Sequence, residues 1–174
     1  MSRSLVLVAC LAVAPLALGG GGAGRYVAPA DYVTGAFPRG APQASVVWLT
    51  GELRARIEEA LGHPVSTLRV RGWYDGTTSA WILDEVGKEM PITVGITVAD
   101  GAVADVRILE FRESRGWEVR YPFFTDQFRL ARLADDDRLD RRIDGITGAT
   151  LSVAAVKRVV RVALLLHEQV ASRQ

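Results

Sequence analysis

The sequence has little cysteine and little histidine, the residue types that hold most zinc ions and iron–sulfur clusters in proteins. Among 174 residues there are one cysteine and two histidines. Cys10 lies in an N-terminal segment that we expect to be removed, so the remaining chain can form no disulfide, thiolate metal site or iron–sulfur cluster. His63 and His167 lie far apart in sequence. Each is expected at the surface or at a helix end rather than in a set of metal ligands.

An apolar run long enough to span a membrane is also lacking. Residues 5–18 are apolar, but a membrane-spanning helix needs roughly 20 such residues. Arg3 is the only charge before Arg25, and residues 19–24 are small. A short basic start, an apolar stretch and small residues are the layout of a secretory signal. We therefore predict that residues 1–24 are a signal peptide and that the protein is exported, to the periplasm or to the outer face of the cytoplasmic membrane.

Two other fates of the N-terminus stay open. The segment Leu7-Val8-Ala9-Cys10 is similar to a bacterial lipobox, which would make Cys10 a lipidated N-terminus, although little apolar sequence precedes it. The apolar run could also remain as an uncleaved anchor.

An excess of charge of one sign is absent as well. Lys and Arg number 21 against 20 Asp and Glu, and loss of Arg3 with the signal makes the two counts equal. This balance gives no electrostatic reason to expect nucleic acid or an anionic membrane as partner.

Residues 25–45 are rich in Gly, Pro and Ala and predict a flexible linker, and residues 46–174 predict the folded domain. The first element of that domain is a helix. Four apolar residues spaced four apart indicate it, with Thr50 placed to cap it and Gly62 to end it. These apolar residues are Leu49, Leu53, Ile57 and Leu61.

The apolar period then changes to two, which indicates strands. Asp75-Gly76 and Asp100-Gly101 each separate two alternating runs, the strongest short signal for a β-hairpin. The pattern predicts an antiparallel meander of about four strands with one buried face. The alternating residues after the first hairpin are Ile92, Val94, Ile96 and Val98, followed by Ala104, Val106 and Ile108.

Two segments after the meander are less regular. Phe123, Phe124 and Phe128 suit either a short helix or a packed loop. The acidic group at residues 135–137 with Asp140 invites a metal interpretation, but it lacks the alternating oxygen ligands and the glycine of a calcium loop. A solvated loop is the favoured alternative.

Residues 151–171 predict a long amphipathic helix. An apolar stripe runs along one side, and Lys157, Arg158, Arg161 and Glu168 lie on the other. The domain is therefore predicted to be α+β, an antiparallel meander packed with an N-terminal helix and a long C-terminal helix. The stripe consists of Val153, Val156, Val160 and Leu164.

The segment directly before this helix carries the candidate site. It reads Asp144-Gly145-Ile146-Thr147-Gly148-Ala149-Thr150-Leu151-Ser152. Composition alone favours a helix cap at Thr147 or Thr150 and a tight turn at Gly148. The alternative is a phosphate site, because the first turn of a helix presents unpaired N–H groups and the positive end of its dipole. A threonine at this place could hold a phosphate covalently.

Thr147-Gly148-Ala149-Thr150 resembles the [S/T]-G-A-T motif of the FMN-binding domain family, which includes subunits of the sodium-translocating NADH:quinone reductase and of the Rnf complex. The resemblance implies that FMN is joined to Thr150 through a phosphoester. It also implies a separate flavin transferase that uses FAD as donor and needs magnesium. Asp144, Ala149 and Ser152 match further positions of the family pattern, and Leu151 completes the cofactor segment.

The resemblance covers about residues 68–170. Glu113-Ser114-Arg115-Gly116 matches the Glu-Thr-Pro-Gly loop that lies near the flavin ring in the respiratory subunits. It implies that Glu113, Ser114 and Gly116 also bind the cofactor. Ser-Arg in place of Thr-Pro is a departure from that pattern.

These expectations converge on an exported flavoprotein that relays electrons between membrane or periplasmic redox partners. We expect a carrier rather than a stand-alone enzyme, with no catalytic residue and no protein-bound metal. Two alternatives are an exported flavin-dependent oxidoreductase with its own substrate and a non-redox interaction module whose TGAT merely caps a helix.

Overall fold

The computed structural model describes residues 24–38, 40 and 42–173 of the chain. Residues 1–23 of the predicted signal peptide, Cys10 among them, lie outside the described residues.

The described chain folds around one six-stranded antiparallel sheet, in the order β1-β6-β5-β4-β3-β2. The predicted meander forms its four consecutive strands β3 to β6, and a strand is added at each edge. The α+β class predicted from the sequence is confirmed. The strands are β1 (Gly24–Arg25), β2 (Gln43–Trp48), β3 (Arg69–Tyr74), β4 (Thr78–Val86), β5 (Pro91–Ala99) and β6 (Ala102–Phe111).

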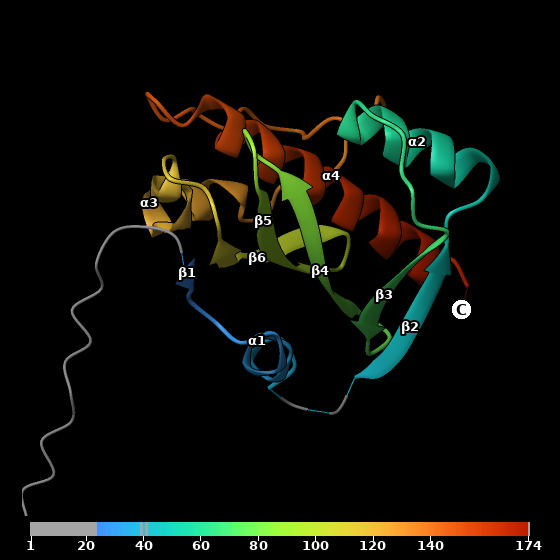
Figure 1. Ribbon diagram of the computed structural model, residues 1–174. Helices are drawn as coiled ribbons and strands as arrows, with labels where there is room; N and C mark the ends of the chain where they lie inside the picture. Colours follow the sequence, from blue (N-terminus) through green and yellow to red (C-terminus); the bar gives the residue numbers. More distant parts are fainter. Residues whose placement is uncertain (1–23, 39, 41, 174) are drawn as a thin grey trace, which may run out of the picture.

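Helices cover both faces of the sheet (Figure 1). The long C-terminal helix α4 (Thr150–Ala171) and α2 (Gly51–Leu61) pack on one face, and α1 (Pro29–Ala36) packs on the other. The predicted helix after Leu49 is confirmed as α2, and Gly62 ends it in the left-handed conformation with φ 76°. Thr50 holds the capping position, but its side chain makes no capping hydrogen bond.

The hairpin between β5 and β6 follows from its turn residues, and its bulges set which side chains face the core. Asp100 and Gly101 both have positive φ, 51° and 72°, as a two-residue turn between twisted strands requires. A register shift follows between Val98 and Thr97, so Asp105 rather than Ala104 lies opposite Thr97. A bulge inserts one residue and reverses the alternation, which the period-two pattern alone could not locate.

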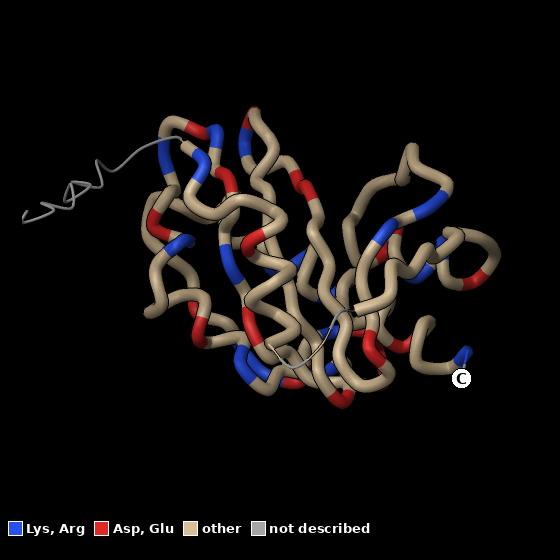
Figure 2. Tube along the Cα trace, turned by 90° about the horizontal axis from the view of Figure 1, so that it is seen from below, with Lys and Arg blue, Asp and Glu red and all other residues tan. Residues whose placement is uncertain are grey.

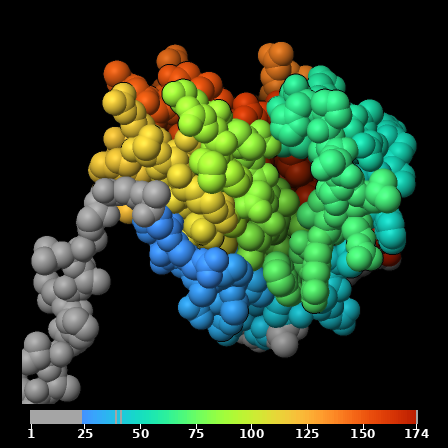
Figure 3. Space-filling model, in the orientation of Figure 1, coloured from blue at the N-terminus to red at the C-terminus, as the bar shows by residue number. Residues whose placement is uncertain are grey.

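The prediction of one buried face is wrong for β5, and so is the flexible linker over residues 25–45. The Tyr32 side chain, on α1 within that segment, is 4% exposed, and its hydroxyl lies 2.7 Å from Thr97 Oγ1 on β5. The ring packs so closely that a Cβ on Gly95 would lie 2.7 Å from it. The segment is rich in small residues, yet two aromatic side chains, Tyr32 and Phe37, bury against the sheet and order it. Figure 3 shows α1 in blue against the sheet.

The two irregular segments also become ordered by side-chain contacts. The aromatic stretch forms a 3₁₀ turn (Trp117–Arg120), the short helix α3 (Pro122–Thr125) and a second 3₁₀ turn (Asp126–Phe128). In the acidic loop, Asp137 is not merely solvated. Its carboxylate accepts two hydrogen bonds from the Arg56 guanidinium of α2, at 2.8 and 2.6 Å.

The two histidines differ in their surroundings. His63 is half exposed and lies 3.2 Å from the Glu85 carboxylate. His167, expected at the surface or a helix end, is 5% exposed and lies between Ser79 Oγ, 2.8 Å from Nδ1, and the Gly101 N–H, 3.2 Å from Nε2. Burial lowers the pKa of His167, with the Asp100 charge acting weakly in the opposite sense.

Across residues 24–38, 40 and 42–173, no helix combines the length and the apolar character needed to cross a membrane. Basic and acidic residues alternate over the trace without a large region of one sign (Figure 2).

Candidate functional site

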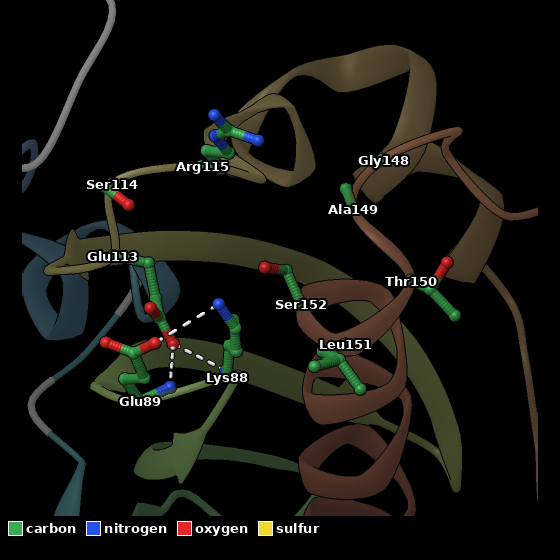
Figure 4. A pocket seen from close by; sticks show the side chains of 10 residues that line it. All are labelled: Lys88, Glu89, Glu113, Ser114, Arg115, Gly148, Ala149, Thr150, Leu151 and Ser152. Atoms are coloured by element: carbon green, nitrogen blue, oxygen red, sulfur yellow. Dashed lines mark hydrogen bonds and ion pairs between the residues drawn. The ribbon is translucent and has the colours of Figure 1, made fainter.

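A cavity of about 610 Å³ opens where three segments meet: the start of α4, the loop after β6, and the turn between β4 and β5. Figure 4 shows the side chains around it, and Figure 3 shows the β4–β5 turn beside the chain that leads into α4. Most of the residues that the sequence assigned to the site come together here. The lining residues are Lys88, Glu89, Glu113, Ser114, Arg115, Gly148, Ala149, Thr150, Leu151 and Ser152.

The first turn of α4 forms one wall of the cavity. Neither Thr147 nor Thr150 caps the helix: Ala149 is the N-cap residue, Thr150 is the first helical residue, and no side chain makes a capping bond. Gly148 has φ 83°, which confirms the predicted tight turn. Because no described side chain caps the helix start, its first N–H groups and the positive end of its dipole stay available to an anion.

The three hydroxyl side chains of the motif lie in different environments. Thr150 is exposed and lines the cavity. Ser152 also lines it but is 4% exposed, and Figure 4 shows its side chain pointing toward the Glu113–Ser114 loop. Thr147 is exposed but does not line the cavity. Thr150 is therefore the hydroxyl of the motif that both lines the cavity and is accessible from solvent.

Glu113 ties two walls of the cavity together. Its side chain is 6% exposed, and its Oε1 atom accepts hydrogen bonds from the backbone N–H groups of Lys88, Glu89 and Met90, at 2.5, 2.7 and 3.0 Å. Burial acts to raise the pKa of Glu113, but the three N–H donors outweigh it, so the pKa lies below its usual value. The carboxylate thus stays ionised and holds the β4–β5 turn against the loop after β6.

Two glycines permit this close assembly. A Cβ on Gly87 would lie 3.0 Å from Glu113 Oε1, so a side chain there would press on the carboxylate. Gly116 has φ 87°, and a Cβ on it would lie 2.4 Å from Ser152 Oγ. Gly116 does not line the cavity as expected. It instead lets the loop after β6 pack directly on the first turn of α4.

Asp144 lies apart from the cavity. Its side chain is 74% exposed and pairs with Arg142 at 3.2 Å, while its N–H donates to Gln127 Oε1 at 2.7 Å. Among the described residues, no backbone N–H of the motif donates to the Asp144 carboxylate. The Asp144 side chain therefore caps no turn of the motif among the described residues.

Sequence reasoning missed three residues of the lining. Lys88 and Glu89 belong to the β4–β5 turn, which the fold brings next to α4 across more than sixty positions of chain. Arg115 is one of the two residues at which this chain differs from the family loop. Its exposure, between buried Glu113 and buried Gly116, is apparent only from the structure of the loop. No local pattern shows which part of the chain a turn will face.

Residues 87–165 match the family model of the FMN-binding domain, which confirms the resemblance inferred from the motif. The match begins at the β4–β5 turn and runs into α4, so it contains every residue that lines the cavity. No significant match to a curated protein or to a solved structure was found.

Proposed function

This chain carries an FMN-binding domain, and on that premise we propose that it is an exported electron carrier with FMN joined by a phosphoester to Thr150. The observation that carries the proposal is the position of the Thr150 side chain. It is an exposed hydroxyl on the first residue of a 22-residue helix, at the edge of a cavity within the matched segment.

The residues around the cavity suit the chemistry of FMN. The uncapped start of α4 is suited to a phosphate, because its N–H groups and dipole attract negative charge. Gly148 and Ala149 leave room beside that phosphate, and the cavity volume of about 610 Å³ falls in the range of ligand pockets. Glu113, Ser114 and Leu151 would surround the remainder of the cofactor. When bound, the flavin supplies the redox chemistry, and the protein supplies position and electrostatics.

Maturation by a flavin transferase fits the exposure of the segment. A threonine hydroxyl is a weak nucleophile, so a base or a metal ion must activate it. Thr150 Oγ would form a bond to the flavin-bearing phosphorus of FAD as the bond to the AMP half breaks, and its proton would pass to the transferase. Asp144 is exposed and free of any capping duty, which suits recognition by the transferase or help in holding its magnesium.

A carrier role is favoured over an enzyme with its own substrate. Glu113 is the buried carboxylate of the cavity, and its lowered pKa keeps it an acceptor of three N–H groups rather than a proton donor. An ester-linked cofactor also cannot diffuse away, which suits a protein working outside the cytoplasm between membrane or periplasmic redox partners.

The test is coexpression of the full chain with a flavin transferase, followed by the intact mass of the mature protein from the periplasm. We expect the mass of one FMN phosphoester, loss of the N-terminal segment, and a denatured protein band that fluoresces under ultraviolet light. A colourless protein with the mass of the bare chain would refute the cofactor linkage. Full-length mass in the cytoplasmic fraction would refute export.

Three variants locate the ester. Thr150→Ala should abolish the fluorescent band, whereas Thr147→Ser and Ser152→Ala should keep it at least in part. Since the Thr150 side chain makes no capping bond, its loss should change the free energy of unfolding by about 1 kcal/mol or less. A fluorescent Thr150→Ala band, or peptide mapping that places the added mass on Thr147 or Ser152, would show that the acceptor is another residue.

A further inference from the structure

We propose that Arg115 sets the redox potential of the bound flavin, by placing an uncompensated positive charge at the cavity. The inference rests on the proposed function, because it presumes that the cavity holds flavin. It concerns the residue at which this chain departs from the family loop.

The charged residues of the cavity are not equivalent. Lys88 Nζ lies 3.2 Å from Glu89 Oε1, so these two side chains compensate each other. The Glu113 carboxylate is turned toward the β4–β5 turn, where three backbone N–H groups donate to it and screen its charge. Within the described part of the chain, Arg115 forms no ion pair and no hydrogen bond. Its charge, together with the start of α4, is therefore what a ligand in the cavity meets.

The loop that carries Arg115 is held at both ends. On one side Glu113 is bound to the β4–β5 turn, and on the other Gly116 packs against Ser152 with no room for a Cβ. The two residues between these anchors, Ser114 and Arg115, are exposed and line the cavity. In Figure 4 Arg115 lies on the same loop as Glu113, across from the start of α4. The two anchors keep the backbone of Arg115 at the mouth of the cavity, so its charge stays within reach of a ligand there.

This charge acts on reduction because reduction changes the charge of the flavin. Two electrons and one proton from a donor dye leave the ring with one negative charge. A nearby cation opposes that charge and stabilises the reduced state over the oxidised one, most strongly where the site is shielded from water. Removing the cation should lower the midpoint potential, and the reduced ring should then hold a second proton more tightly.

The experiment is a redox titration of the flavinylated full chain against dyes of known potential, at several pH values. We expect Arg115→Gln to reduce the equilibrium constant for reduction about tenfold or more, a fall of about 30 mV for a two-electron couple. Arg115→Lys should recover most of the wild-type value, because it keeps the charge. The midpoint potential falls less steeply with pH above the pH at which the reduced ring loses its second proton. This change of slope should lie at a higher pH in Arg115→Gln than in the wild type.

Arg138→Gln is the matched control, since it removes one arginine charge from an exposed loop that does not line the cavity. Equal potentials for Arg115→Gln and Arg138→Gln would overturn the proposal. A redox titration reports only the molecules that contain flavin, so incomplete loading of a variant does not change its measured potential. If Arg115→Lys loads and Arg115→Gln does not load at all, the charge acts in cofactor attachment and the proposal is again overturned. Wild-type protein without flavin would instead refute the proposed function.

Discussion

Replacing Gly116 by alanine should disturb the candidate site far more than one methyl group suggests. Gly116 has φ 87°, a conformation that costs an L-residue about 1–2 kcal/mol. The new Cβ would lie 2.4 Å from Ser152 Oγ and 3.2 Å from Ser152 Cβ. Overpacking of this kind typically costs a further 1–3 kcal/mol, roughly. We expect Gly116→Ala to lower the free energy of unfolding by about 2–5 kcal/mol.

The partner variant separates the two causes. Ser152→Ala removes the atom that the new Cβ would meet first and leaves the closer-than-usual Cβ contact at 3.2 Å, so in that background Gly116→Ala should cost less, close to the conformational part of about 1–2 kcal/mol. The difference between backgrounds, about 1–3 kcal/mol, is the coupling energy of the pair. Gly145→Ala is the matched control in the same region. A Cβ there meets nothing within 4 Å, so its effect should stay within about 0.5 kcal/mol.

The assay is denaturant unfolding of the flavin-free full chain, with the slope compared between variants so that a change of midpoint can be read as a change of stability. If Gly116→Ala costs the same with and without the Ser152 hydroxyl, the packing of this loop on α4 is not as described. If it costs less than about 1 kcal/mol in both, the left-handed conformation at Gly116 is also refuted.

Three further predictions address other residues. Asp144→Asn should lose most of the covalent flavin on coexpression while unfolding like wild type, because the carboxylate makes only an exposed ion pair; a wild-type ratio of flavin absorbance to protein would remove Asp144 from the site. Glu113→Gln should cost about 1–2 kcal/mol in denaturant unfolding and speed amide exchange at residues 88–90, because three bonds to a charged oxygen become bonds to a neutral one; unchanged exchange would contradict this role. His167 has a lowered pKa, so the unfolded chain takes up the proton first and the free energy of unfolding should fall as the pH drops below about 6.5. The measurement is made in a His63→Gln background, because the pKa of His63 is raised by its bonds to Pro64 and Glu85 and its titration acts in the opposite sense. A free energy of unfolding that does not change with pH in that background would refute the assignment.

Much of the fold follows from local signals in the sequence. Asp75-Gly76 and Asp100-Gly101 mark hairpins because their residues accept the conformations that tight turns need, and the helices before Gly62 and after Ala149 follow from apolar spacing. The sequence also predicted the start of α4, since Thr-Gly-Ala-Thr places small residues and hydroxyls before an amphipathic run. The family match at residues 87–165 confirms what that motif indicated.

Other features were decided by tertiary contacts that no local pattern records. The segment around Tyr32 reads as a linker, yet it becomes α1 because the Tyr32 ring finds a flat surface at Gly95 and a hydroxyl partner at Thr97. The same contact covers the second face of β5. His167 is likewise buried because Ser79 and Gly101, distant in sequence, supply its two partners.

The candidate site shows the same division. The candidate residues follow from the sequence alone: a hydroxyl at Thr150, at the start of a helix whose first N–H groups suit a phosphate, because helix starts and small residues are local properties. Tertiary contacts establish which hydroxyl is accessible and that Glu113 binds the β4–β5 turn, and they leave Arg115 without a partner among the described residues. Accessibility and charge compensation depend on what the rest of the chain brings alongside a residue, and a strand or a turn does not encode its neighbours.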